Sequence, residues 1–259
     1  MLRRSQEDAI RQYYEALSIA WGPQHWWPAE TQFEVIVGAY LTQNTAWINV
    51  ERALANLRRA HSLSVEGIRA VRLSRLERLI HPSGYFRQKA KRLKIFVAFL
   101  DSNYGGSIEK LFAQPTETLR EELLNLNGVG PETADSILLY AANHPVFVVD
   151  AYTRRILERH AILDGKADYE DIRELLQRAL KSVAQQERQA PAPLASEANS
   201  DARGAAHAPS PMSTTERTEL VQVYNEMHGL IVGVGKFHCG KSQPKCDHCP
   251  LQPFLPGVK

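Results

Sequence analysis

One short stretch near the middle of the chain, residues 126–135, constrains the fold more than any other. It places Gly128 and Gly130 directly before Pro131, a residue that suits the first position of a helix. Apolar residues at helical spacing precede and follow it, so the pattern predicts helix, tight turn, helix. Glycines that open a helix leave amide groups bare beside the positive end of the helix dipole. The hairpin therefore predicts a site for one phosphate of a nucleic-acid backbone, or an ordinary turn in which the glycines serve only the chain reversal.

The rest of the sequence also predicts helices. The first helix is expected over about residues 5–20, and a nearly all-apolar helix, which should be central, follows Thr31. A Ser or Thr three residues before a Glu is a capping box, which predicts where a helix begins. Such pairs are Thr31–Glu34, Ser74–Glu77, Thr118–Glu121 and Ser213–Glu216. Because no alternating apolar pattern of convincing length is present, we predict an all-α fold.

Composition sets broad limits. The chain has 259 residues, of which 44% are hydrophobic and 23% are charged, as in ordinary globular proteins. The net charge of +2 does not by itself indicate a nucleic-acid partner. Basic residues crowd residues 87–94, around Lys89, which is either a phosphate-binding track or a solvated helix face. Neither a signal peptide nor an apolar run long enough for a membrane span is visible, so we expect a cytoplasmic, monomeric protein without membrane contact.

A carboxylate follows the hairpin at an informative place. Asp150 comes directly after the apolar run Val146–Val149 and before a predicted helix. The motif Leu-x-Gly-Val-Gly followed by this aspartate resembles the helix-hairpin-helix (HhH-GPD) DNA glycosylases of the endonuclease III superfamily. The resemblance implies that Asp150 is catalytic and that Gly128, Val129 and Gly130 grip DNA. An aspartate that caps a helix is the simpler alternative, and the two roles are compatible.

Several stretches narrow the resemblance: Trp26–Pro28, Leu41–Thr45 with Trp47, Pro82–Tyr85, Glu132–Asp135 and Met227–Gly229. Together with the hairpin they resemble the bacterial 3-methyladenine DNA glycosylases of endonuclease III type. In the superfamily a Gln enters the duplex where the target nucleotide leaves, and Gln43 matches it, which implies a DNA contact for Gln43 with the adjacent Asn44. From the residues alone, Gln43 and Asn44 mark only the end of a helix.

An aromatic pocket for the base is implied by the same resemblance. Its members would be Trp26, Trp27, Pro28 and Trp47. An alkylated adenine is positively charged, and electron-rich rings attract a cation. The alternative for the paired tryptophans is core packing.

The residue two positions after the last hairpin glycine separates two kinds of enzyme in this superfamily. Bifunctional members carry a Lys there, whose amine forms a Schiff base that leads to strand cleavage. Glu132 stands at that position and cannot form an imine. The sequence therefore predicts a monofunctional DNA glycosylase without AP lyase activity. The alternatives are an endonuclease III-like glycosylase and lyase on oxidised pyrimidines, with an amine elsewhere, and a non-catalytic DNA-binding module.

Three cysteines close to the C-terminus have the spacing of metal ligands. Cys239, Cys246 and Cys249 form a C-x6-C-x2-C pattern that suits an iron–sulfur cluster or zinc. The pattern is similar to the C-x6-C-x2-C-x5-C cluster loop of many endonuclease III relatives, but its fourth position is Leu255. The resemblance implies a [4Fe-4S] cluster with three Cys ligands, to which His238 or His248 could be added. Three free thiols are the alternative.

The domain organisation also follows from the resemblance. We expect a helical barrel domain with the hairpin over residues 25–147, and a second domain made of residues 1–24 and 148–259. A damaged base would flip out of double-stranded DNA into the cleft between them. Residues from about 185 to 211 are poor in large apolar side chains, so we expect a disordered insertion there.

Overall fold

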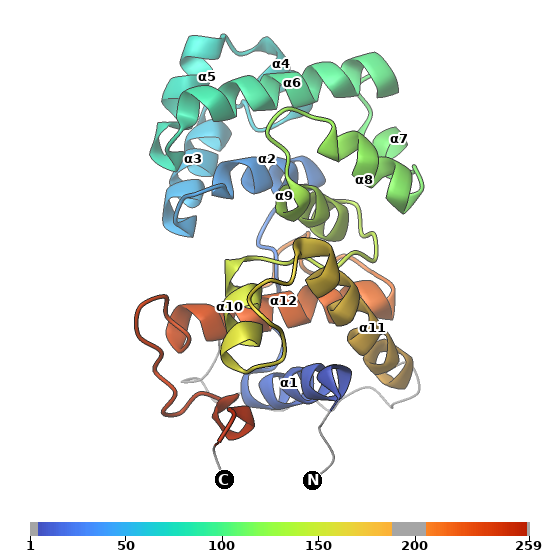
Figure 1. Cartoon of the computed structure of the whole chain (residues 1–259). Coiled ribbons are helices and arrows are strands. Elements are labelled where there is room, and N and C mark those ends of the chain that lie inside the picture. The colour runs from blue at the N-terminus through green and yellow to red at the C-terminus, as the bar shows by residue number, and fades with distance from the viewer. Residues whose placement is uncertain (1–4, 188–205, 258–259) are drawn as a thin grey trace. The chain divides into compact units, whose positions relative to one another are not determined.

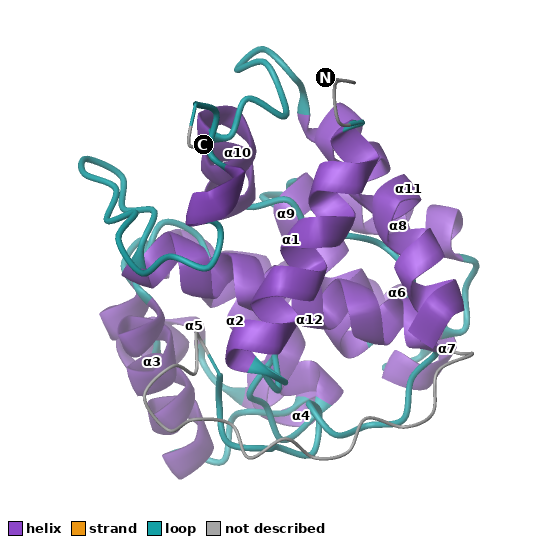
Figure 2. Cartoon of the chain, turned by 90° about the horizontal axis from the view of Figure 1, so that it is seen from below, coloured by secondary structure: helices purple, strands orange, loops and turns teal. Residues whose placement is uncertain are grey.

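The computed structural model describes residues 5–187 and 206–257, and these ranges are built from helices and connecting loops (Figure 2). In them we find no strand, only an isolated bridge between Cys239 and Pro244. The all-α prediction is therefore confirmed. Within the same ranges, every helix is too short or too polar to cross a lipid bilayer.

The chain divides into two compact units, one of residues 29–144 and one of residues 1–28 with 145–259. Figure 1 shows the helices of each. Helices of the first unit are α2 (Gln32–Thr42), α3 (Trp47–Arg59), α4 (Val65–Ala70), α5 (Leu73–Leu79), η1 (His81–Ser83), α6 (Phe86–Tyr104), α7 (Ile108–Phe112), α8 (Thr116–Leu124), α9 (Pro131–Ser136) and the π-helical η2 (Ile137–Ala141). Helices of the second unit are α1 (Gln6–Trp21), α10 (Ala151–Arg159), α11 (Tyr169–Glu187), α12 (Glu219–Phe237) and η3 (Gln252–Phe254).

Helix α2 is the centre of the first unit, as its apolar sequence predicts. Its residues Phe33–Leu41 are all buried, and it packs against α3, α6, α9 and η2. The Thr31 side chain accepts a hydrogen bond from the Glu34 amide at 3.1 Å, so this capping prediction is confirmed. The end of α2 therefore carries Gln43 out of a rigid core.

The other three capping boxes are wrong. Helices α5, α8 and α12 begin elsewhere, after Arg72, Pro115 and Thr218. The Thr218 side chain accepts from the Val221 amide and caps α12 in place of Ser213. A Ser or Thr three residues before a Glu is common by chance, and packing of the apolar face decides which turn becomes the first.

Helix α12 is the centre of the second unit. It packs against α1, α10 and α11, and most of its residues between Val221 and Gly235 are buried. Small residues allow close approach: a Cβ added to Gly235 would lie 2.1 Å from the Tyr152 ring on α10. This helix therefore fixes α10, whose N-terminus carries Asp150.

The expected insertion at residues 185–211 lies mostly outside the described residues, which omit 188–205. At the two ends of this range, the prediction of disorder is wrong. Helix α11 continues to Glu187. On the other side, the His207 amide donates to the Gln24 carbonyl at 3.0 Å, and the His207 ring lies 5.1 Å from the Trp26 ring. These ends belong to the folded unit, because secondary structure and an aromatic contact order them.

Candidate functional site

The hairpin forms as the sequence predicts, with Gly128 at its turn and Pro131 as the first residue of α9. Gly128 has a φ of +78°, a conformation that glycine adopts readily. Gly130 differs, because its φ is −99° and any residue can adopt that value. The Val129 side chain is buried, and its amide donates to the Leu126 carbonyl at 3.1 Å, inside the turn. Only Gly128 is therefore required for backbone reasons.

Gln43 is bound to this hairpin. Its side-chain amide donates to the Gly128 carbonyl at 3.0 Å and to Thr133 Oγ1 at 2.9 Å. Its side-chain oxygen accepts from Arg92 Nη1 at 2.8 Å. Arg92 also lies against the turn: a Cβ added to Gly128 would be 1.9 Å from Arg92 Nε. The structure thus brings two predicted DNA-binding elements together and adds Arg92, which the sequence shows only as one basic residue among several.

Lys89 requires a correction. Its side chain is only 1% exposed, and Nζ donates to the carbonyl oxygens of Leu41 at 2.8 Å and Ser83 at 2.7 Å. Burial, with a smaller contribution from the Arg92 charge, lowers the pKa of Lys89 to about 8. Lys89 is covered by its own domain, so it does not present a charge to a phosphate. Instead it ties the end of α2 to the turn before α6.

Asn44 and Trp47 lie just after Gln43. Asn44 is exposed and has a φ of +53°, which an Asn tolerates better than most residues. Trp47 begins α3 and is half-buried, and its indole nitrogen donates to the Glu51 carboxylate at 3.0 Å. The turn after α2 and the start of α3 therefore carry an exposed amide and a half-buried indole, close in sequence to the hairpin-bound Gln43.

Asp150 caps α10, as the simpler alternative from the sequence predicts. Its Oδ1 accepts from the Thr153 amide at 2.7 Å and from Thr153 Oγ1 at 2.8 Å. Its other oxygen, Oδ2, lies 3.6 Å from His228 Nε2 on α12. Burial raises the pKa of the Asp150 carboxyl, but His228 and the Thr153 hydrogen bonds outweigh it, so the pKa lies below its ordinary value. Asp150 is therefore an ionised carboxylate whose side chain is 12% exposed.

His228 connects this carboxylate to the paired tryptophans. It is buried, and its ring packs edge-on against the rings of Trp26 at 6.3 Å and Phe147 at 6.3 Å between centroids. The sequence shows His228 only within a Met-His-Gly match to the resembled subgroup. The pairing with Asp150 depends on α10 and α12 lying side by side, which no local pattern reveals.

The paired tryptophans are more enclosed than the base-pocket prediction requires. Trp26 and Trp27 are each 6% exposed, and Pro28 is half-buried. The Trp26 ring also has Lys236 Nζ 5.5 Å from its centroid, a cation–π geometry. The packing alternative therefore describes Trp26 and Trp27 in this structure, and Trp47 is the more accessible tryptophan of the predicted pocket.

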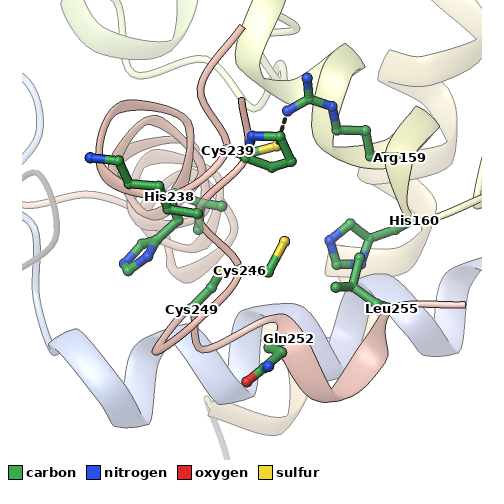
Figure 3. A pocket seen from close by; sticks show the side chains of 11 residues that line it. Arg159, His160, His238, Cys239, Cys246, Cys249, Gln252 and Leu255 are labelled. Carbon is green, nitrogen blue, oxygen red and sulfur yellow. Dashed lines mark hydrogen bonds between the residues drawn. The ribbon is translucent and has the colours of Figure 1, made fainter. Parts of the chain in front are cut away.

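The cysteines line a single pocket of about 280 Å³ in the second unit (Figure 3). None of the three forms a disulfide, and Cys239 is buried. Arg159 Nη1 donates to Cys239 Sγ at 3.2 Å, and Arg155 Nε donates to the Cys239 carbonyl at 2.7 Å. Burial raises the pKa of the Cys249 thiol, and the neighbouring Cys246 and Cys239 raise it further.

These donors suit a cluster better than a single ion. Zinc binds thiolates at about 2.3 Å, so its ligands crowd one point. Among the described residues, no three His, Cys, Asp or Glu side chains are arranged in that way. Thiols around a pocket that Arg159 also lines fit a larger anionic group such as an iron–sulfur cluster. Leu255, at the fourth ligand position, also lines the pocket.

Comparisons with known proteins identify the family of this chain. Residues 37–182 match the family described as HhH-GPD superfamily base excision DNA repair protein. A protein of Methanocaldococcus jannaschii that is named a DNA repair glycosylase is 39% identical over 98% of both chains. Endonuclease III of Bacillus subtilis is 23% identical over 85% of this chain and 78% of its own.

Two solved structures are similar over most of their length. The H. pylori 3-methyladenine DNA glycosylase, bound to 1,N6-ethenoadenine, has a TM-score of 0.68 and 26% identity, covering 88% of this chain and 96% of its own. A non-covalent endonuclease III–DNA complex has a TM-score of 0.70 and 20% identity, covering 96% and 95%. At that identity the second likeness shows the fold alone.

Proposed function

Because the chain belongs to the HhH-GPD superfamily of base excision DNA repair proteins, a family of DNA glycosylases, we propose that it releases an alkylated purine from DNA without cutting the strand. Damaged double-stranded DNA is the proposed partner. The observation that carries the proposal is the Asp150 carboxylate, kept ionised by Thr153 and His228 at the N-terminus of α10. A non-catalytic DNA-binding module does not need a poorly exposed carboxylate of this kind.

The chemistry asked of Asp150 is electrostatic. When the bond between C1′ and the base nitrogen breaks, its electron pair leaves with the base, and positive charge develops on the sugar. A carboxylate close to C1′ stabilises that charge strongly where little water is present. Water then adds to C1′ and gives its proton to Asp150 or to solvent. Thr153 holds Oδ1, so Oδ2 is the oxygen that we assign to the reacting sugar.

An alkylated purine is the substrate class that this machinery suits best. A base that carries a positive charge leaves as a neutral molecule, so no strong acid is needed to protonate it. The similar H. pylori enzyme was solved with a modified adenine, which supports a purine substrate. Trp47 is the indole that we expect to stack on the flipped base, because Trp26 and Trp27 are enclosed.

The DNA contacts that we propose lie in the hairpin unit. We expect a DNA phosphate to lie close to the backbone of Gly128, Val129 and Gly130. Contacts to phosphates position the protein on the duplex but do not read the base sequence. Gln43 and Asn44 fill the space that the flipped nucleotide leaves. Because three hydrogen bonds hold the Gln43 side chain to the hairpin and Arg92, entering the duplex requires that Gln43 exchange some of them for bonds to DNA bases.

Absence of lyase chemistry is proposed from Glu132. This residue is exposed in the first turn of α9, where a negative charge complements the helix dipole. A Schiff base needs an unprotonated amine in contact with C1′. Lys89 has a lowered pKa but is enclosed by Leu41 and Ser83, so it is no substitute.

A [4Fe-4S] cluster on Cys239, Cys246 and Cys249 is the proposed cofactor. When bound, such a cluster supplies electron-transfer capacity and a rigid staple for the loop. Two arginines of α10 hold that loop through Cys239: Arg155 donates to its carbonyl oxygen and Arg159 donates to its sulfur. None of the steps assigned to Asp150 depends on the cluster.

The test of the proposed function is a panel of duplexes, each with one defined lesion. The lesions are 3-methyladenine, 1,N6-ethenoadenine, an oxidised pyrimidine and a normal base, and the released bases are identified by chromatography. We expect alkylated adenines to be released by the wild-type protein and not by Asp150→Asn. Release of the oxidised pyrimidine alone would overturn the substrate class, and release of no base would overturn the enzymatic proposal.

A further inference from the structure

The cysteine pocket has three thiols, and the position that would supply a fourth holds an apolar side chain. Leu255 lines the pocket and has no atom that binds a metal. Iron–sulfur clusters are usually held by four protein ligands, and histidine replaces cysteine in some of them. A cluster with four protein ligands would therefore need a ligand from another side chain of this unit.

His160 is a pocket residue outside the cysteine loop whose side chain can bind a metal. It ends α10 and lines the same pocket as the three cysteines and Leu255. Figure 3 shows its ring pointing into the pocket, on the side where Leu255 lies. The residue before it, Arg159, already binds Cys239, so the end of α10 is fixed to the cysteine loop.

The Nδ1 atom of His160 has a hydrogen-bond partner. Its Nδ1 lies 2.7 Å from the hydroxyl oxygen of Tyr13 on α1. Metal-binding histidines almost always donate their second ring N–H to a hydrogen-bond acceptor, which fixes the tautomer and the ring orientation, and the Tyr13 oxygen is such an acceptor. When Nδ1–H donates to the Tyr13 hydroxyl oxygen, Nε2 carries a lone pair, and Nε2 is then the ring nitrogen that can bind a metal.

The two histidines that stand closer to the cysteines in sequence are poorer candidates. His238 lines the pocket too, but its ring is stacked on Trp21, with centroids 5.9 Å apart and planes 13° from parallel. His248 does not contribute to the pocket lining. His160 is remote in sequence, so spacing alone could not indicate it.

We propose that His160, through Nε2, is the fourth protein ligand of a [4Fe-4S] cluster whose other ligands are Cys239, Cys246 and Cys249. Tyr13 orients the ring from the far side. This inference rests on the proposed cluster and concerns only how this chain compensates for Leu255. It implies that the cluster ties together α1, α10 and the C-terminal loop of the same unit.

The decisive experiment detects nitrogen bound to iron. The full chain is produced with and without ¹⁵N-histidine, purified without oxygen, reconstituted with iron and sulfide, reduced, and examined by pulsed electron paramagnetic resonance. We expect a nitrogen coupling of a directly bound imidazole, which changes with the label. The coupling should persist in His238→Ala, the matched control from the same pocket, and vanish in His160→Ala.

Iron content gives a second readout. His160→Ala should lose most of its bound iron and visible absorbance, and adding Leu255→Cys to that variant should restore both. Tyr13→Phe should weaken metal retention by about 10- to 100-fold, as loss of an orienting partner does.

The two proposals fail in different ways. An iron-free wild-type protein, or one that holds only zinc, would overturn the cluster and the role of His160 together. A wild-type protein that holds iron but shows no histidine nitrogen coupling would overturn the role of His160 alone.

Discussion

The hairpin turn offers a prediction whose size follows from the structure. Gly128→Ala places a side chain at a φ of +78°, which costs about 1–2 kcal/mol for a residue other than glycine. The new Cβ would also lie 1.9 Å from Arg92 Nε, so the Arg92 side chain has to move. That movement removes its 2.8 Å hydrogen bond to Gln43, and bonds of this charged kind contribute about 1.5–3 kcal/mol. We expect the free energy of unfolding to fall by about 2–4 kcal/mol in total. This is less than the simple sum, because the Arg92–Gln43 hydrogen bond is only partly buried.

Gly130→Ala is the matched control two residues away. Its φ is −99°, and no heavy atom lies within 4 Å of an added Cβ, so the free energy of unfolding should change by no more than about 0.5 kcal/mol. Urea denaturation followed by circular dichroism measures both variants at unchanged m-value. In an Arg92→Ala background, Gly128→Ala should cost only its backbone part, about 1–2 kcal/mol. Equal losses for the two glycine variants would refute this account of the turn.

Three further predictions concern single side chains. Asp150→Asn should keep the cap on the Thr153 amide and leave stability nearly unchanged, whereas Asp150→Ala should lose about 1 kcal/mol in thermal melts; a destabilised Asn variant would argue against the cap. Both should release base at least about 10²-fold more slowly in single-turnover assays. The pKa of Lys89 is lowered from 10.5 to about 8 in the folded chain. Between pH 8 and 10.5 the unfolded chain therefore binds more protons at Lys89 than the folded chain does. The contribution of Lys89 to the free energy of unfolding should rise with pH across that window. In denaturation at several pH values, wild type should gain stability relative to Lys89→Met, while Lys91→Met, exposed on the same helix, should follow wild type. Trp47→Ala should weaken binding of alkylated purine duplexes by about 1–3 kcal/mol and spare undamaged DNA; an equal loss for both would place the base elsewhere.

The fold could be predicted because apolar spacing and the glycine-proline turn are local signals. The first helix, the buried helix after Thr31 and the Pro131 start of α9 all appear where the sequence places them. The exact starts of α8 and α12 could not, because tertiary packing chooses among several possible caps.

The site was only partly predictable for a similar reason. Charge alone suggested that Lys89 faces DNA, yet its neighbours in the folded chain are two carbonyl groups. His228 and His160 each lie beside their partners only because helices from distant parts of the sequence pack together. A single sequence contains residue types and spacing, but not which lysine or histidine becomes enclosed.

The central claim is that Asp150 promotes hydrolysis of the glycosidic bond without an amine intermediate. The most direct measurement is a single-turnover reaction on a duplex with one 3-methyladenine, with and without borohydride, and with and without later alkali. We predict that the wild-type protein releases the base, that the strand breaks only after alkali, and that borohydride traps no protein–DNA adduct. A trapped adduct with a strand broken before alkali would contradict the account and show that a lysine performs lyase chemistry.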